Sequence, residues 1–146
     1  DHEFGEGTSY RIWQTTRRRA GYYDDWGRLQ GIGFTDQDRV LSVEWTAGAV
    51  FACRMIALHY AKTHPDWAKE MESDAIRMRL GIDPFRTRLA DGSEAYLYAN
   101  RRFFIPFGWW ANPLPSLVST AWVVLLDKQY NPFWPDGIYP PSQKLD

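Results

Sequence analysis

The sequence predicts a mainly α-helical fold, part of an (α/α) barrel or toroid, with a small β-hairpin flap. Three observations lead to this prediction. Two segments, near residues 42–62 and 116–129, are apolar on almost every side, as expected of buried helices. The segment between them, residues 65–80, carries a single apolar stripe, which is typical of a surface helix. The dipeptide Asp91-Gly92 then indicates a tight turn between two short strands.

The first buried helix is expected from Ser42 to Lys62. Its apolar residues, which include Trp45, Val50 and Phe51, surround the axis, so most of its sides should be covered. Ser42 is suited to cap the N-terminus, and an acid in the first turn, here Glu44, is favourable beside the helix dipole.

The surface helix is expected from Pro65 to Leu80, because proline suits the first helical position and Gly81 suits the stop. The second buried helix is expected from Ser116 to Gln129. Helices joined by a connection as short as Thr63-His64 are usually antiparallel neighbours. The two buried helices should therefore run in the same direction, and their N-termini should share one face.

The remaining segments complete a single domain over residues 1–146. Tyr10 to Arg19 is a further possible helix. The hairpin flap should pair Phe85–Leu89 with Ala95–Tyr98, and Phe103–Phe107 is a candidate for a further strand. Residues 108–115 should form a rigid aromatic loop, and the proline-rich residues 132–146 an extended tail.

Composition excludes several classes of function. The chain has 146 residues, with 17 basic and 18 acidic ones and a net charge of −1, which argues against nucleic acid and against a polybasic membrane patch. No apolar run approaches the roughly 18 residues that a membrane span requires. Cys53 is the single cysteine and the three histidines are scattered, so neither an internal disulfide nor a metal site is expected. No cofactor motif is present.

Glu44 is the carboxyl group best placed for catalysis. Partial burial beside Trp45 would raise its pKa and let it act as a general acid, whereas capping its own helix or pairing with an arginine is the alternative. Acid/base hydrolysis of a glycosidic bond needs a second carboxylate. Asp36 and Asp38 are the candidates for it, and the pair at residues 24–25 is a further candidate that can equally be a solvated turn.

Aromatic residues make up 16% of the chain, and eight of them are tryptophans. Some must lie in the core, but indole rings also complement the apolar face of a sugar ring. The candidate sugar platforms are Trp26, Trp45, Trp109 and Trp110, and Asn112 is a candidate polar neighbour. For the adjacent pair in the aromatic loop, one ring is expected to face inward and one outward. Two further residues beside aromatics, at 101–102, are candidates to contact an anionic ligand.

Three stretches of the sequence carry a family resemblance: GIGFTD at residues 31–36, SVEWTAGA at 42–49 and RFFIPFGWWANPLPS at 102–116. They resemble the C-terminal part of bacterial (α/α)6-barrel carbohydrate-active proteins, the glucoamylase-like and polysaccharide-hydrolase group, over about residues 31–133. The resemblance implies a sugar cleft at the N-terminal ends of the inner helices. A complete barrel of that group has twelve helices, and this chain has too few, so the remainder would come from another chain or from the rest of a longer precursor.

Two functions are therefore expected from the sequence, and whether the chain is an enzyme stays open between them. The first is a fragment or subunit of a secreted glycoside hydrolase that cleaves a poly- or oligosaccharide, with an extracellular or periplasmic location. The second is a non-catalytic protein of the same fold that binds glycan or builds an extracellular assembly. A helical terpene-cyclase-like enzyme ranks below both, because no aspartate-rich metal motif is present.

Overall fold

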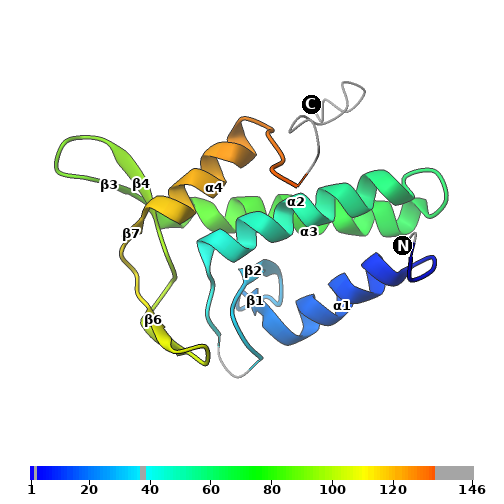
Figure 1. The fold of residues 1–146 in the computed structure, drawn as a ribbon, viewed down its shortest axis with the longest axis horizontal. Coiled ribbons are helices and arrows are strands. Elements are labelled where there is room, and N and C mark those ends of the chain that lie inside the picture. Colours follow the sequence, from blue (N-terminus) through cyan, green and yellow to red (C-terminus); the bar gives the residue numbers. More distant parts are fainter. Residues whose placement is uncertain (2, 37–38, 134–146) are drawn as a thin grey trace.

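The computed structural model describes residue 1, residues 3–36 and residues 39–133 of the chain (Figure 1). In these residues the elements follow one another as α1 (Thr8–Ala20), β1 (Gly21–Tyr23), β2 (Leu29–Ile32), α2 (Val43–Tyr60), α3 (Pro65–Ile82), the short 3-10 helix η1 (Asp83–Phe85), β3 (Arg86–Arg88), β4 (Glu94–Leu97), β5 (Phe103–Ile105), β6 (Trp109–Ala111), β7 (Pro115–Ser116) and α4 (Leu117–Asp127). Of the predicted tail at residues 132–146, residues 134–146 lie outside the described part.

The prediction of a partial (α/α) barrel is wrong. The described chain is a small mixed α/β domain, in which four α-helices accompany three small antiparallel sheets. The error lies in α4, which was expected to be buried on most sides. Val123 and Leu126 are buried, but Leu117 is 86% exposed and Val124 is 50% exposed. Its all-round apolar pattern therefore comes from apolar side chains that face outward, and not from helices packed on every side.

Helices α2 and α3 form the centre of the molecule as an antiparallel pair. The Ser42 side chain accepts a hydrogen bond from the Trp45 backbone N–H and caps α2, as its sequence predicts. The predicted apolar stripe of α3 is confirmed, because Met71, Ala75 and Met78 are buried against α2. Burial of these faces supplies the main hydrophobic contribution to the fold.

Helix α1 packs across the α2–α3 pair through a buried polar contact. Trp13 is buried, and its indole Nε1 donates to Oδ2 of Asp74 at 2.9 Å. Arg17 forms an ion pair with the same Asp74 oxygen at 2.9 Å and a second ion pair with Glu70 at 2.7 Å. The buried carboxylate of Asp74 thus has charged and neutral donors, which is the condition for keeping a charge inside a protein.

Three small sheets lie around the helices. The predicted turn at Asp91-Gly92 is confirmed between β3 and β4, and Gly92 has a φ of 83° that favours glycine. Strand β7 adds to β4 and leads directly into α4. Residues 108–115, expected to form a loop, instead contribute β6 and β7. The reason is that β5, within the predicted strand at 103–107, needs a partner for its backbone groups and finds one in β6.

The core has two parts. The larger cluster joins α1, β2, α2, α3 and α4. The second cluster contains Phe34, Val40, Ala99, Ile105 and Ala111, and it fixes the β5–β6 hairpin to the segment before α2. Figure 1 shows α2 and α4 beginning on the side of the molecule where β7 lies, so their N-termini share one end as the sequence predicts. Among the described residues, no helix combines the length and apolar character needed to cross a bilayer.

Candidate functional site

The predicted site residues fall into two regions. Glu44 and Trp45 lie in the first turn of α2, while Trp109, Trp110 and Asn112 belong to β6 and the residue after it. The other candidates, Trp26 and Asp36, line a cleft elsewhere in the molecule. Asp38 lies outside the described residues. Acid/base hydrolysis would need two carboxyl groups at one site. The structure does not bring Glu44 and Asp36 together, because Asp36 lines this cleft and Glu44 does not.

Glu44 is a half-buried carboxyl group with no hydrogen bond or ion pair to another described residue. Two influences act on its pKa: burial disfavours the charged form, and the positive end of the helix dipole favours it. Burial prevails, so the pKa of Glu44 is raised above its usual value of 4.5. Such a group can donate a proton at a higher pH than an ordinary glutamate can.

Trp45 connects this turn to the second core cluster. Its ring meets Phe34 edge to face, with 5.3 Å between ring centroids, and Phe34 in turn contacts Tyr98 at 5.9 Å. The Trp45 side chain still leaves 39% of its surface exposed. One side of the indole is thus anchored, and the remainder faces solvent beside Glu44.

The register of the β5–β6 hairpin sends the two adjacent tryptophans to opposite faces. Ile105 pairs with Trp109, and Phe104 pairs with Trp110. Because side chains alternate along a strand, Trp109 shares the face of buried Ile105, and Trp110 lies on the outer face. Trp109 is 47% exposed and Trp110 is 50% exposed, so neither ring is sealed in the core.

The outer face of the hairpin has its own partners. The Trp110 ring lies edge to face with Phe104 at 5.2 Å, and the Arg102 guanidinium sits 4.2 Å from the Trp110 ring centroid. The Asn112 side-chain NH2 donates to the backbone carbonyl of Trp110 at 3.4 Å. The predicted polar neighbour is therefore partly committed to its own strand.

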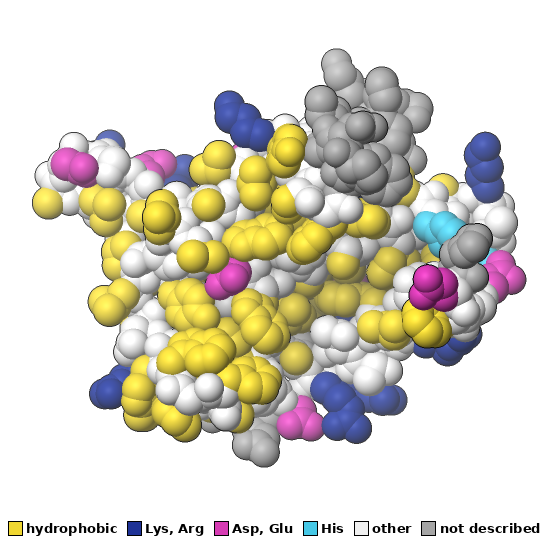
Figure 2. Space-filling model, viewed as in Figure 1, with side chains coloured by type: hydrophobic (Ala, Val, Ile, Leu, Met, Phe, Trp, Pro, Cys, Tyr) yellow, Lys and Arg dark blue, Asp and Glu magenta, His cyan; other side chains and the backbone are white. Residues whose placement is uncertain are grey.

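Trp45 and Trp109 are each joined to the second cluster, Trp45 through its ring contact with Phe34 and Trp109 through its pairing with Ile105. We call these two rings, together with Phe107 and Glu44, the aromatic surface. Phe107 is 6.0 Å from Trp109 between ring centroids. Figure 2 shows hydrophobic side chains gathered over β6 and the first turns of α2 and α4, with an acidic side chain among them. This arrangement offers flat apolar rings next to a proton-donating or hydrogen-bonding group.

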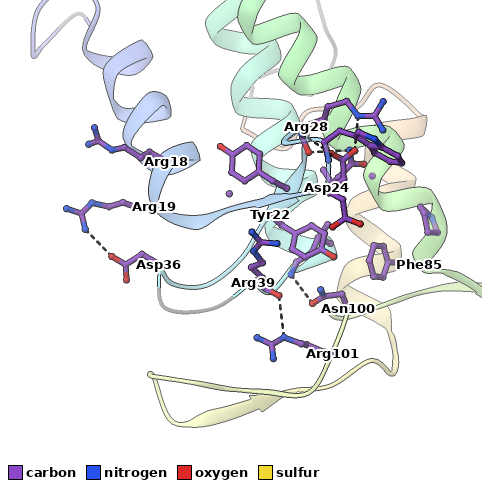
Figure 3. Close-up of a pocket in the computed structure, with 18 residues that line it drawn as sticks. Arg18, Arg19, Tyr22, Asp24, Arg28, Asp36, Arg39, Phe85, Asn100 and Arg101 are labelled. Atoms are coloured by element: carbon purple, nitrogen blue, oxygen red, sulfur yellow. Dashed lines mark hydrogen bonds and ion pairs between the residues drawn. The ribbon is translucent and has the colours of Figure 1, made fainter.

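The cleft that holds Trp26 and Asp36 has a volume of about 1210 Å³ and lies between α1, the β1–β2 hairpin and the end of α3 (Figure 3). We call it the arginine cleft, since its lining includes Arg18, Arg19, Arg28, Arg39 and Arg101. Sequence reasoning missed most of it, because its residues come from distant segments. Trp26, Asp36 and the pair at residues 24–25 were candidates, and so was the basic pair at residues 101–102, which the structure divides between the cleft and the ring of Trp110.

The two carboxylates at residues 24–25 also belong to the arginine cleft. Asp24 stabilises the β1–β2 turn, since its side chain accepts from the backbone N–H groups of Trp26 and Arg28 and pairs with the Arg28 side chain at 2.8 Å. Burial acts to raise the pKa of Asp24, but these hydrogen bonds prevail and lower it below its usual value. Asp24 is thus a structural carboxylate, and not a general base with a free lone pair.

No group of three or more histidine, cysteine, aspartate or glutamate side chains suited to a metal ion occurs among residues 3–36 and 39–133. Cys53 is buried in α2, and burial raises the pKa of its thiol far above the ordinary range, which makes it a poor nucleophile. Comparison of the chain with protein-family models, curated proteins and solved structures finds no match.

Proposed function

We propose that the chain binds a carbohydrate on the aromatic surface. The observation that carries this proposal is the combination of partly exposed indole rings, Trp45 and Trp109, with a carboxyl group that has no partner among the described residues. The C–H face of a pyranose is apolar and flat enough to lie on an indole. Its hydroxyl groups then need hydrogen-bonding partners at the edge of the ring, and Glu44 is such a partner.

Rigid placement favours this kind of binding. Trp45 is held by Phe34, and Trp109 is held by the strand pairing of β5 and β6. Rings that are already ordered lose little conformational freedom when a ligand lies on them. An arrangement of this kind supports binding without requiring a closed cavity.

Isothermal titration calorimetry with neutral hexasaccharides of glucose and xylose tests the proposal. Trp109→Ala should weaken binding several-fold, up to about tenfold, because it removes one aromatic platform. Trp110→Ala is the matched control, since it removes the neighbouring indole from the opposite face of the same hairpin. Equal losses in both variants, or no binding of any neutral oligosaccharide, would contradict the proposal.

Hydrolysis is a second candidate function, and the raised pKa of Glu44 is the observation that favours it. Wild-type protein incubated with the same hexasaccharides should then release new reducing ends. Glu44→Gln should abolish this release and retain binding, because the amide keeps the shape but cannot donate the proton. Absence of any reducing ends from the wild type leaves binding as the function.

We also propose that another polypeptide, or another part of a longer precursor, covers the outer side of α4. Leu117, Val118 and Val124 are all about half exposed or more, and an apolar patch of this kind is typical of an interface. Sedimentation velocity should show self-association that Val124→Asp reduces. A monodisperse monomer at high concentration would contradict this part of the proposal.

A further inference from the structure

The arginine cleft carries an excess of positive charge, although the chain as a whole has a net charge of −1. Among the described residues, its lining holds five arginines and three aspartates. Two of the aspartates are engaged, Asp24 with Arg28 and Asp36 with Arg19. The third is Asp25, which is exposed. Among the described lining residues, the carboxylates are thus fewer than the guanidinium groups.

Arg39 is the cation best placed to meet a ligand. It makes no ion pair with any residue of the described chain, and its backbone carbonyl accepts a hydrogen bond from Arg101 Nε at 3.3 Å. Figure 3 shows the Arg39 side chain pointing toward Tyr22, whereas Arg19 points away toward Asp36. A guanidinium in this position can bind a carboxylate or sulfate group with two parallel hydrogen bonds.

The wall beside Arg39 is aromatic and amide-lined. Tyr22 on β1 and Phe85 at the end of η1 are half-buried and contribute ring surface. The Asn100 side-chain oxygen accepts from the Leu41 backbone N–H at 2.9 Å, which fixes the amide. Its NH2 group has no partner among the described residues, so it can donate to a ligand hydroxyl or carboxylate.

We infer that the arginine cleft binds an acidic oligosaccharide, with Arg39 pairing to an anionic group and Tyr22 and Phe85 contacting sugar rings. A volume of about 1210 Å³ exceeds the roughly 300–1,000 Å³ of ordinary small-molecule pockets, which favours a ligand of several rings. The lining contains both guanidinium groups and aromatic rings, and an acidic oligosaccharide presents both anionic groups and apolar C–H faces. This site shares no residue with the aromatic surface, and the inference does not depend on the function proposed for that surface.

Calorimetry with three hexasaccharides tests the inference: an oligogalacturonate, which carries carboxylates, a sulfated galactan oligosaccharide and neutral cellohexaose. The wild type should bind at least one of the two acidic ligands at the cleft, and which one it prefers identifies the anionic group. Binding should weaken as salt rises, because ion pairing at an open cleft is screened. Failure of both acidic ligands to bind would overturn the inference, and so would tighter binding of ATP than of either.

Arg39→Ala should weaken binding of the acidic ligand about tenfold or more, as expected for loss of a charge-assisted pair. Arg77→Ala is the matched control, because it removes the same charge from an exposed position of α3 outside the cleft. Arg39 is exposed, so its removal leaves the core intact, and a thermal melt verifies this. Equal effects of Arg39→Ala and Arg77→Ala would overturn the inference.

The two sites are separated by a second pair of measurements. Trp109→Ala should leave acidic-ligand binding at the arginine cleft unchanged, and Arg39→Ala should leave neutral-ligand binding at the aromatic surface unchanged. If Trp109→Ala removes acidic-ligand binding while Arg39→Ala does not, the acidic ligand lies on the aromatic surface and the inference is wrong. Loss of neutral binding alone contradicts only the proposed function.

Discussion

Glu44 on the aromatic surface and Asp24 in the arginine cleft are both partly buried carboxyl groups, yet their pKa values move in opposite directions. Glu44 has no hydrogen-bond donor among the described residues, so burial raises its pKa. Asp24 accepts from the N–H groups of Trp26 and Arg28, so hydrogen bonding outweighs burial and lowers its pKa. The difference indicates which carboxyl group is available to a ligand and which one serves the fold.

The two regions also depend on different parts of the structure. The aromatic surface is built on the second core cluster and the β5–β6 hairpin. The arginine cleft depends on α1, the β1–β2 hairpin and the end of α3. Substitutions that loosen one support should therefore impair one region and spare the other.

Asp74→Ala should have the largest effect. It removes the acceptor of the Trp13 indole and one ion-pair partner of Arg17, leaving a buried donor without a partner. Breaking a buried charge network costs about 3 kcal/mol of unfolding free energy. Because α1 carries Arg18 and Arg19 to the cleft, acidic-ligand binding should weaken as well, measured by urea denaturation and calorimetry.

Glu70→Ala is the control for Asp74→Ala. It removes the other ion-pair partner of Arg17, at a position that is only half-buried. Its cost in unfolding free energy should be about 1 kcal/mol or less. Neutral-ligand binding at the aromatic surface should persist in both variants, and its loss in the folded Asp74→Ala protein would contradict the separation of the two regions.

Much of the local structure was predictable because it rests on local chemistry. Ser42 as a cap, the stripe of α3 and the turn at Asp91-Gly92 each depend on neighbours within a few residues. The overall architecture was not predictable in this way, and the predicted barrel is wrong, because an apolar helix can bury all its sides or leave some exposed. The exposed Leu117 and Val124 have the same sequence signature as buried residues.

Gly81→Ala should have the next largest effect on stability, and Gly81 is one of the residues that line the arginine cleft. A Cβ at position 81 would lie well inside van der Waals contact of the Gln30 backbone carbonyl, so α3 and β2 must separate. Forced separation of packed backbones costs about 1–3 kcal/mol. Thermal denaturation should show this loss, and acidic-ligand binding should weaken more than neutral-ligand binding does.

Gly48→Ala is the matched control for Gly81→Ala. It is also a helical glycine, in α2, but a Cβ there meets nothing within 4 Å. Alanine is the better helix former, so this variant should be unchanged or slightly more stable. A Gly81→Ala protein as stable as Gly48→Ala would show that β2 does not need its close contact with α3.

The candidate site was predictable in its residue types but not in its grouping. Glu44, Trp45 and Trp109 were identified because a carboxyl group and rings stand near helix and strand ends. The expected grouping of Asp36 with Glu44 does not appear, since Asp36 pairs with Arg19 and lines the arginine cleft, whose lining does not include Glu44. Arg39, Tyr22 and Phe85 come together only through the packing of β1 and η1, which no local pattern encodes.

The smallest expected effect comes from pH, and it tests the opening comparison directly. The raised pKa of Glu44 means that the folded chain binds more protons than the unfolded chain as pH rises above 4.5, so ionised Glu44 disfavours the fold at neutral pH. The lowered pKa of Asp24 has the opposite sign: its contribution to the stability of the fold is present above pH 3.8 and is lost as pH falls through the folded pKa.

Thermal melts of Glu44→Gln and Asp24→Asn at about pH 7 and about pH 4 measure both contributions to stability. Glu44→Gln should melt slightly above the wild type at the higher pH, and Asp24→Asn should melt below it. The Glu44→Gln difference should shrink at the lower pH, because wild-type Glu44 is then largely protonated, whereas the Asp24→Asn difference should persist there, because Asp24 stays ionised until the pH falls below 3.8. A Glu44→Gln protein that melts below the wild type at neutral pH would mean that the ionised carboxylate stabilises the fold through a partner. Glu44 would then be a structural carboxylate like Asp24, and it could not serve as the polar group of the aromatic surface.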